Sequence, residues 1–167
     1  LFGVRVSLSV GLVAVLISLT IGIFMGSIAG YYRGTIDNII MWFINVIWAI
    51  PTILLAMAIR FAIGDKIPSF LAIFIAVGLS MWVEVARIVR GQVLVVREME
   101  YIQAARGLGF QNLRIIIKHI LPNIIGPIMV IAASDFASAI LIEAGLSFVG
   151  IGVKPPTPSW GTMLNDH

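Results

Sequence analysis

The sequence contains no cysteine and few charged residues. Of its 167 residues, 11% are charged and 60% are hydrophobic, and the mean hydropathy is +1.07. The absence of cysteine excludes disulfides and thiolate metal sites. A soluble globular protein carries about 25% charged residues, and so few charges cannot cover a surface that faces water. The composition therefore excludes a water-soluble enzyme, a disordered tail and a coiled coil, and it predicts a membrane protein.

Several motifs of enzymes and nucleotide-binding proteins are also absent. The sequence has no P-loop (G-x-x-x-x-G-K followed by Ser or Thr), no H-E-x-x-H and no G-x-S-x-G, and its only imidazoles are His119 and His167. These motifs place phosphates, zinc or a nucleophilic serine, respectively. We therefore expect this chain to bind no ATP, metal or other cofactor and to contain no catalytic residue.

The small basic excess admits two interpretations, a nucleic-acid partner or basic cytoplasmic loops of a membrane protein. The formal net charge is +3, and six of the eleven Lys and Arg residues lie in one stretch, 84–119, between hydrophobic blocks. Basic residues concentrate in the cytoplasmic loops of membrane proteins. We interpret the excess as membrane orientation, with 84–119 in the cytoplasm, and expect no binding to nucleic acid.

Long uncharged runs predict four membrane-spanning helices. A helix needs about 20 apolar residues to cross the hydrocarbon core. In lipid every backbone polar group must be satisfied within its own segment, so the expected fold class is all-α, a polytopic membrane helix bundle. Pro51 and Pro127 interrupt two of the runs and are expected to kink them. The expected spans are residues 6–32, 38–59, 67–83 and 120–142.

The whole chain, 1–167, is expected to form one transmembrane domain. Alternation across the membrane then places the last segment, 144–167, outside as a loop rich in Gly and Pro. The chain begins with Leu rather than Met and ends within that predicted loop. We therefore expect a fragment of a longer protein.

The first span carries a repeat of small residues. Ser18, Gly22, Gly26 and Gly30 recur every four residues and so share one helix face. Such a face lets a second helix approach closely. The pattern predicts tight helix packing, either within the chain or against a partner.

Two acidic residues of the fourth hydrophobic block are candidates for the translocation path. Asp135 lies near its middle, where a carboxylate is costly and indicates either a transport path or a hydrogen bond to a neighbouring helix. Glu143 lies at the outer end, where it indicates either a gate or a hydrogen bond between helix and loop. The sequence leaves both alternatives open.

The cytoplasmic segment predicts a helix, a glycine bend and a second helix. Residues 98–106 are largely good helix formers, with acidic residues first and Arg106 last, as the helix dipole favours. Gly107 and Gly109 end this helix, and an apolar periodicity of three and four resumes after Gln111. Periodicity leaves two interpretations open, a compact protruding element or an amphipathic stretch on the lipid headgroups.

This segment resembles a known signature. Gln103, Ala104 and Ala105, then Gly109, then Leu121 with Pro122, are similar to the EAA motif of permease subunits of ATP-binding-cassette importers. Gln103 departs from the usual Glu, and His119 replaces a branched apolar residue. The resemblance to the peptide/nickel branch of this family extends over segments 89–92, 100–101, 106–109, 119–123, 143–152 and 155–161.

The resemblance implies a type I importer permease fold, of which this chain would cover the part from the second span to just before the sixth. The signature segment would be the coupling helix, which docks into a groove on a cytoplasmic ATPase. The alanines would allow close approach, and Glu100 and Arg106 would offer charges at the rim. The implied coupling residues are Glu100, Gln103, Ala104, Ala105, Arg106, Gly107, Gly109, Leu121 and Pro122.

The implied function is import across the cytoplasmic (inner) membrane by alternating access. The cargo would be di- or oligopeptides, with nickel complexes or glutathione as related cargo. The implied partners are a second, related permease, two ATP-binding subunits that hydrolyse ATP, and a substrate-binding protein outside. Two alternatives remain: an ion-coupled secondary transporter, which would need several charges within its spans, and a non-transporting membrane scaffold.

Overall fold

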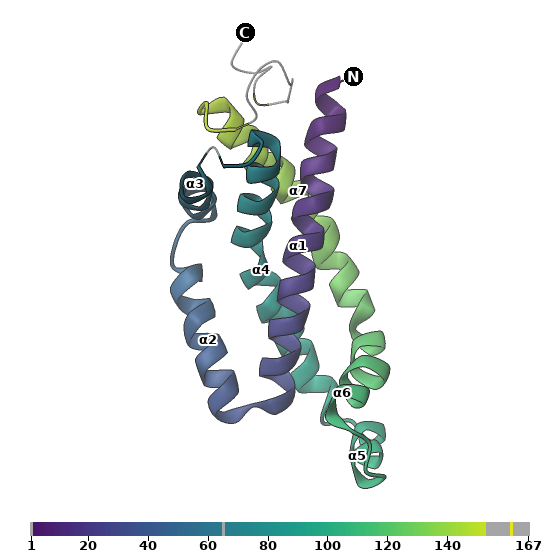
Figure 1. Ribbon diagram of the computed structural model, residues 1–167. Coiled ribbons are helices and arrows are strands. Elements are labelled where there is room, and N and C mark those ends of the chain that lie inside the picture. The colour runs from purple at the N-terminus through teal and green to yellow at the C-terminus, as the bar shows by residue number, and fades with distance from the viewer. Residues whose placement is uncertain (1, 65, 153–160, 162–167) are drawn as a thin grey trace.

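The computed structural model describes residues 2–64, 66–152 and 161, and the elements in this part of the chain are all helical (Figure 1). Seven α-helices follow one another, with a π-helical and a 3-10 segment before the last. Their bounds are α1 Phe2–Tyr32, α2 Gly34–Trp48, α3 Thr52–Ile63, α4 Ser69–Val96, α5 Glu100–Gly107, α6 Asn112–Ile115, the π segment Ile116–Ile120, the 3-10 segment Leu121–Ile124 and α7 Ile125–Phe148.

Three of the helical stretches are long and apolar enough to cross a membrane. They are Val4–Tyr32, Ser69–Val96 and Asn112–Phe148. The pair α2 and α3 passes the same test together but is bent by 93° at the break between them. These helices confirm the predicted fold class, an all-α polytopic membrane helix bundle.

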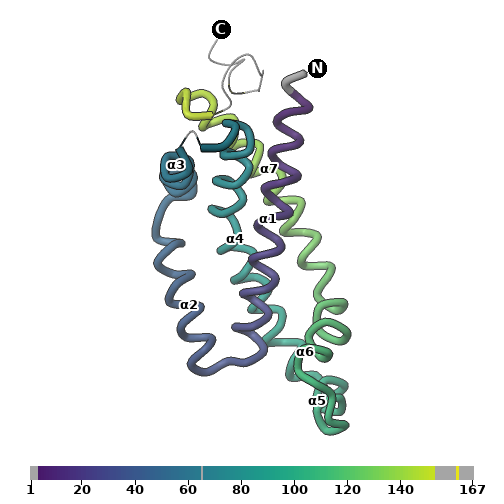
Figure 2. The backbone as a smooth tube through the Cα atoms, viewed as in Figure 1, coloured from purple at the N-terminus to yellow at the C-terminus, as the bar shows by residue number. Residues whose placement is uncertain are grey.

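The bend between α2 and α3 replaces the single kinked span expected over 38–59. Pro51 precedes α3 in an extended conformation, with φ −54° and ψ 130°. Proline has no backbone N–H to donate and disfavours helical backbone in the residue before it, so the helix ends at Trp48 and restarts at Thr52. Figure 2 shows the chain changing direction here.

The helix bounds also differ from the expected spans at the charged residues. Helix α4 continues through Val96, whereas the expected span ended at residue 83, and α7 runs through Phe148 into the expected outer loop. The charges of α4 do not end the helix, because glutamate and arginine are good helix formers. Arg90 pairs with Asp37, and Arg87 stacks on a tryptophan. Of that expected loop, residues 153–160 and 162–167 lie outside the described residues.

Helices α1 and α4 pack face to face along their length (Figures 1 and 2). A Cβ added at Gly22 would lie 2.5 Å from Val85 Cβ, and one at Gly26 would lie 2.5 Å from the carbonyl oxygen of Ala86. Real side chains do not approach so closely. The repeat of small residues on α1 therefore lies against α4 of the same chain.

Candidate coupling element and central cavity

Helix α5 and the turn after it, residues 100–111, contain most of the expected coupling residues, and we call them the coupling element. They lie at the end of the bundle opposite the N-terminus (Figure 1). Glu100 lies in the first turn of α5 and Arg106 in the last, where each complements the helix dipole. Gly109 has φ +79°, a left-handed conformation that favours glycine. The backbone N–H of Phe110 donates to the carbonyl of Ala105 at 3.1 Å and closes the turn.

The two faces of α5 separate the residues of the signature. Ile102 and Ala105 are buried, at 0% and 5% exposure, in the core that they share with α4 and α6. Glu100, Gln103 and Ala104 are exposed. The structure therefore brings Ala104 to the surface, whereas Ala105 packs within the chain, although both were expected to face a partner.

Leu108 is a surface residue that the sequence reasoning missed. It lies between Gly107 and Gly109 at the end of the coupling element, and 74% of it is exposed. The sequence pattern that could have indicated it is an apolar residue between two glycines in the most polar stretch of the chain. An exposed leucine outside the candidate spans gives the element an apolar contact point.

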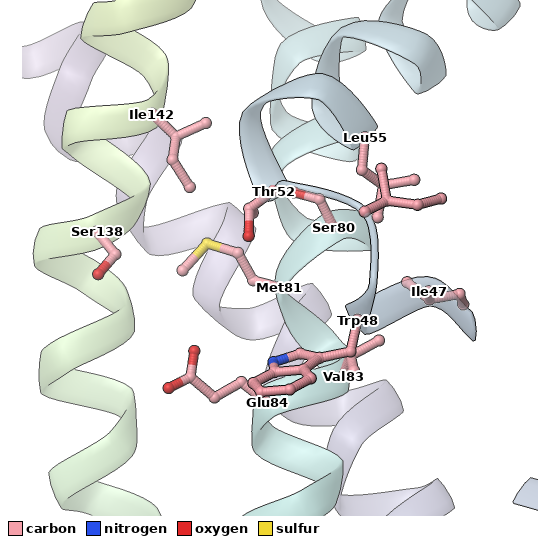
Figure 3. A pocket seen from close by; sticks show the side chains of 11 residues that line it. Ile47, Trp48, Thr52, Leu55, Ser80, Met81, Val83, Glu84, Ser138 and Ile142 are labelled. Carbon is pink, nitrogen blue, oxygen red and sulfur yellow. The ribbon is translucent and has the colours of Figure 1, made fainter. Parts of the chain in front are cut away.

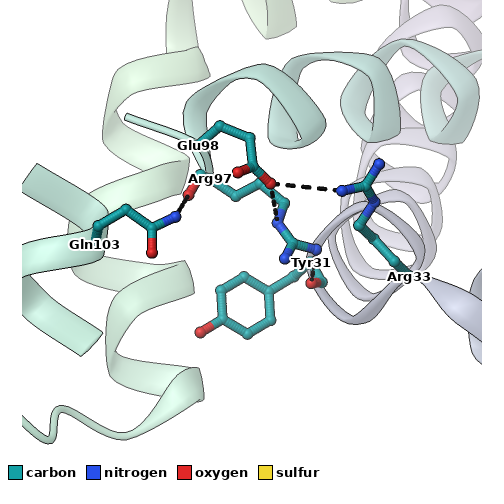
Figure 4. A network of polar contacts seen from close by, with 5 residues as sticks. All are labelled: Tyr31, Arg33, Arg97, Glu98 and Gln103. Atoms are coloured by element: carbon teal, nitrogen blue, oxygen red, sulfur yellow. Dashed lines mark hydrogen bonds and ion pairs between the residues drawn. The ribbon is translucent and has the colours of Figure 1, made fainter. Parts of the chain in front are cut away.

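A network of polar contacts joins the coupling element to the ends of α1 and α4 (Figure 4). Arg97 donates through Nη1 to the carbonyl of Tyr31 at 2.6 Å, and Gln103 donates through Nε2 to the carbonyl of Arg97 at 3.2 Å. Glu98 pairs with Arg97 at 3.0 Å and with Arg33 at 3.5 Å. The Arg33 and Glu98 side chains are both 56% exposed, so that pair contributes little.

Tyr31 is the second residue that the sequence did not single out. Its hydroxyl donates to Asn112 Oδ1 at 2.9 Å, and the guanidinium of Arg106 lies 5.0 Å from its ring centroid. Tyr31 itself is buried, at 5% exposure. One side chain at the end of α1 therefore contacts both α5 and α6 and fixes the orientation of the coupling element.

Leu121 and Pro122 lie where the chain leaves the coupling segment for α7. They open the 3-10 segment Leu121–Ile124, directly after the π segment Ile116–Ile120. Pro122 cannot donate a backbone hydrogen bond, and changes of helix type are common at such points. Leu121 is half-buried against the core and Pro122 is exposed.

A cavity of about 270 Å³ lies between the α2–α3 bend, α4 and α7 (Figure 3). The Glu84 carboxylate extends from α4 toward α7, beside the Trp48 indole. The sequence did not single out Glu84, because the expected third span ended one residue before it. The described lining residues are Ile47, Trp48, Ile50, Thr52, Leu55, Ser80, Met81, Val83, Glu84, Ser138 and Ile142.

Asp135 and Glu143 are absent from the described lining of that cavity. Asp135 is 2% exposed and accepts a hydrogen bond from the Ser18 hydroxyl at 3.4 Å. Glu143 is fully buried and accepts from the hydroxyls of Ser7 at 3.0 Å and Ser147 at 2.7 Å. Both carboxylates therefore join α7 to α1. This favours the hydrogen-bonding alternative for Asp135, whereas the partners of Glu143 lie in helices rather than in the expected loop.

Comparisons with known proteins match this chain to a family of membrane transport proteins. The family model described as "Binding-protein-dependent transport system inner membrane component" matches residues 22–167. The dipeptide transport system permease protein DppC of Bacillus subtilis is 41% identical over 165 residues, which are 99% of this chain and 51% of that protein. The oligopeptide permease OppC of the same organism is 38% identical, over 98% of this chain and 53% of that protein.

A third relative and a solved structure extend the comparison. The glutathione transport system permease protein GsiD of Pectobacterium atrosepticum is 39% identical over 99% of this chain and 54% of that protein. The crystal structure of an amino acid ABC transporter with histidines matches with a TM-score of 0.70 and 20% identity, over 98% of this chain and 75% of that one. The chain spans about half the length of these curated relatives. It belongs to the family of binding-protein-dependent transport system inner membrane components.

Proposed function

We propose that the protein to which this chain belongs is a permease subunit of an ATP-driven importer for small peptides or related cargo. The observation that carries the proposal is the match to peptide and glutathione permeases over almost the whole chain, together with an exposed coupling element at one end of the bundle. Within that importer, this chain contributes to the translocation path and provides the coupling element, and partner subunits hydrolyse ATP.

The mechanism that we propose is alternating access driven through the coupling element. When two ATP-binding subunits close on ATP, a groove on one of them carries α5 with it. Tyr31 transmits this movement to α1, because its ring and hydroxyl contact both α5 and α6. A bundle with two stable packings then converts the shift into opening on the opposite side.

The remaining partners follow from the same proposal. A second permease subunit, which we expect to be related but different, completes the path, and an extracytoplasmic substrate-binding protein delivers the cargo. The long exposed apolar surface of α2, which includes Ile39, Trp42 and Phe43, is available to lipid or to that second subunit.

A crosslinking experiment tests the proposal on α5. This chain contains no cysteine, so Ala104→Cys and Ala105→Cys each introduce its single thiol. In the assembled importer, the exposed position 104 should crosslink to an ATP-hydrolysing subunit. The buried position 105, the next residue of the same helix, is the matched control and should not.

The proposal fails if position 104 never captures a nucleotide hydrolase in a complex shown to be intact. Capture at both positions alike would show that α5 does not dock through the face described above. Cargo uptake that survives removal of ATP and stops when the proton gradient is dissipated would instead support an ion-coupled transporter.

A further inference from the structure

Glu84 supplies the one formal charge among the described residues that line the cavity. It is the sixteenth of the 28 residues of α4, so it lies near the middle of a candidate membrane span. Thr52, Ser80 and Ser138 add hydroxyl groups to the lining, and most of the rest is apolar. The cavity is therefore a small space in which a carboxylate and several hydroxyl groups lie among apolar side chains.

The Glu84 carboxylate forms no ion pair in the part of the chain that the structure describes. Arg87, one turn further along α4, lies over the Trp48 ring at 4.4 Å, and Arg90 is paired with Asp37. Glu84 forms no hydrogen bond or ion pair with a described residue.

A carboxylate in the middle of a membrane helix is costly unless it meets water or a positive group. Glu84 is exposed to the cavity, so its charge is available to whatever enters. Complete drug-sized ligands occupy pockets of about 300–1,000 Å³, and this cavity of about 270 Å³ suits one end of a cargo molecule. The chemistry therefore fits a small cationic group.

We propose that this cavity binds the ammonium group of the cargo, with the Glu84 carboxylate as its counter-charge. The inference rests on the proposed function, because it names the part of a peptide that the permease itself recognises. Every peptide with a free amino terminus carries an ammonium group at that end, whatever its sequence. A single carboxylate among apolar and hydroxyl groups would thus accept many peptides without reading their side chains. The hydroxyls of Thr52 and Ser138 also line the cavity and can accept hydrogen bonds from a bound group.

Direct binding to the complete permease–ATPase complex, purified without its substrate-binding protein, tests this proposal. The probes are radiolabelled dialanine, trialanine and glutathione, and the competitors are the same three compounds with an acetylated amino group. At least one labelled probe should bind, and its acetylated form should compete about 10-fold less well, because acetylation removes the charge. This first comparison uses the unaltered protein and does not depend on how a variant folds.

Two substitutions then assign the effect to Glu84. Glu84→Gln should weaken binding of the free-amino probe about 10-fold and abolish the preference over the acetylated form. Glu84→Asp keeps the carboxylate and should retain that preference. Stimulation of ATP hydrolysis by the loaded binding protein, measured on the same preparations, reports separately on the proposed function.

Equal binding of free and acetylated probes to the unaltered complex would overturn the inference, as would failure of all three probes to bind. So would a Glu84→Gln complex that still prefers the free amino group. Suppose that the unaltered complex shows no preference for the free amino group and that the Glu84→Gln complex dissociates. The Glu84 carboxylate would then contact a partner subunit rather than the cargo. In each case, if the loaded binding protein still stimulates ATP hydrolysis, the proposed function as an importer remains supported. If it does not stimulate ATP hydrolysis by the unaltered complex, the proposed function itself is contradicted.

Discussion

Asp37 and Arg90 form a two-bonded ion pair between α2 and α4, with both N–O distances at 2.6 Å. The side chains are 11% and 27% exposed. A Cβ added at Gly30 of α1 would lie 2.9 Å from the carbonyl oxygen of Arg90. The backbone of Arg90 therefore packs against α1, and its side chain binds Asp37 of α2. Three helices therefore meet at one residue of α4.

Removing one partner of this pair should destabilise the chain. We expect Arg90→Gln to lower the free energy of unfolding by about 3 kcal/mol, because Asp37 then keeps a largely buried charge without a partner. Denaturant unfolding of the purified protein in detergent measures this. The double variant Asp37→Asn, Arg90→Gln is the control and should recover most of the loss. Equal instability of the single and double variants would contradict the explanation.

The close approach of α1 and α4 gives a second prediction. Gly26→Ala should lower the free energy of unfolding by about 1–3 kcal/mol, because its Cβ would meet the backbone carbonyl of Ala86. Gly91→Ala is a matched control on α4, where an added Cβ meets nothing within 4 Å. Alanine there should be neutral or stabilising by up to about 1 kcal/mol. The same unfolding measurement compares both, and equal effects would exclude the close contact as the cause.

Hydrophobic runs and small-residue spacing predicted the helices and the packing face of α1, since both are local properties of the sequence. The spacing of four residues showed that Gly22, Gly26 and Gly30 share a face. It left open which helix covers that face, because the contact with α4 joins residues about 60 positions apart. The local hydrophobic runs therefore predicted the fold class, whereas long-range packing determines how the helices are arranged.

The candidate site was predicted less completely, for two physical reasons. Charges were used to mark the ends of spans, so Glu84 was assigned to a loop. Helix α4 nevertheless continues through Glu84, because charged side chains such as glutamate and arginine do not interrupt a helix. The two faces of α5 could not be separated either, because Ala104 and Ala105 are identical side chains in one motif. Only the core formed by α4 and α6 determines which of them is buried.

Tyr31 provides a prediction about how the coupling element is held. Tyr31→Phe removes the hydrogen bond to Asn112 and keeps the ring beneath Arg106, at a cost of about 1 kcal/mol. Tyr31→Leu also removes the contact between cation and ring, which adds about 0.5–1 kcal/mol. In the importer that we propose, the ratio of cargo-stimulated to basal ATP hydrolysis should therefore fall more for Leu than for Phe. Equal ratios for the two variants and the unaltered protein would show that Tyr31 does not hold the element.

Gly109 tests whether the turn after α5 controls coupling. At φ +79° an alanine is strained by about 1–2 kcal/mol, although nothing lies within 4 Å of the added Cβ. Gly109→Ala should therefore reorient Leu108 and the exposed face of α5, and reduce cargo uptake per ATP in proteoliposomes.

Gly107→Ala is the matched control, because Gly107 is the last residue of α5 and an added Cβ there also meets nothing within 4 Å. The two substitutions add the same methyl group two residues apart, so they differ mainly in the backbone conformation that each requires. Uptake should stay at the unaltered level for Gly107→Ala and return partly in Gly109→Asn, since asparagine tolerates the left-handed region. If both alanine variants lose uptake equally, the added methyl groups obstruct a docking surface, and the left-handed turn is not the feature that coupling requires.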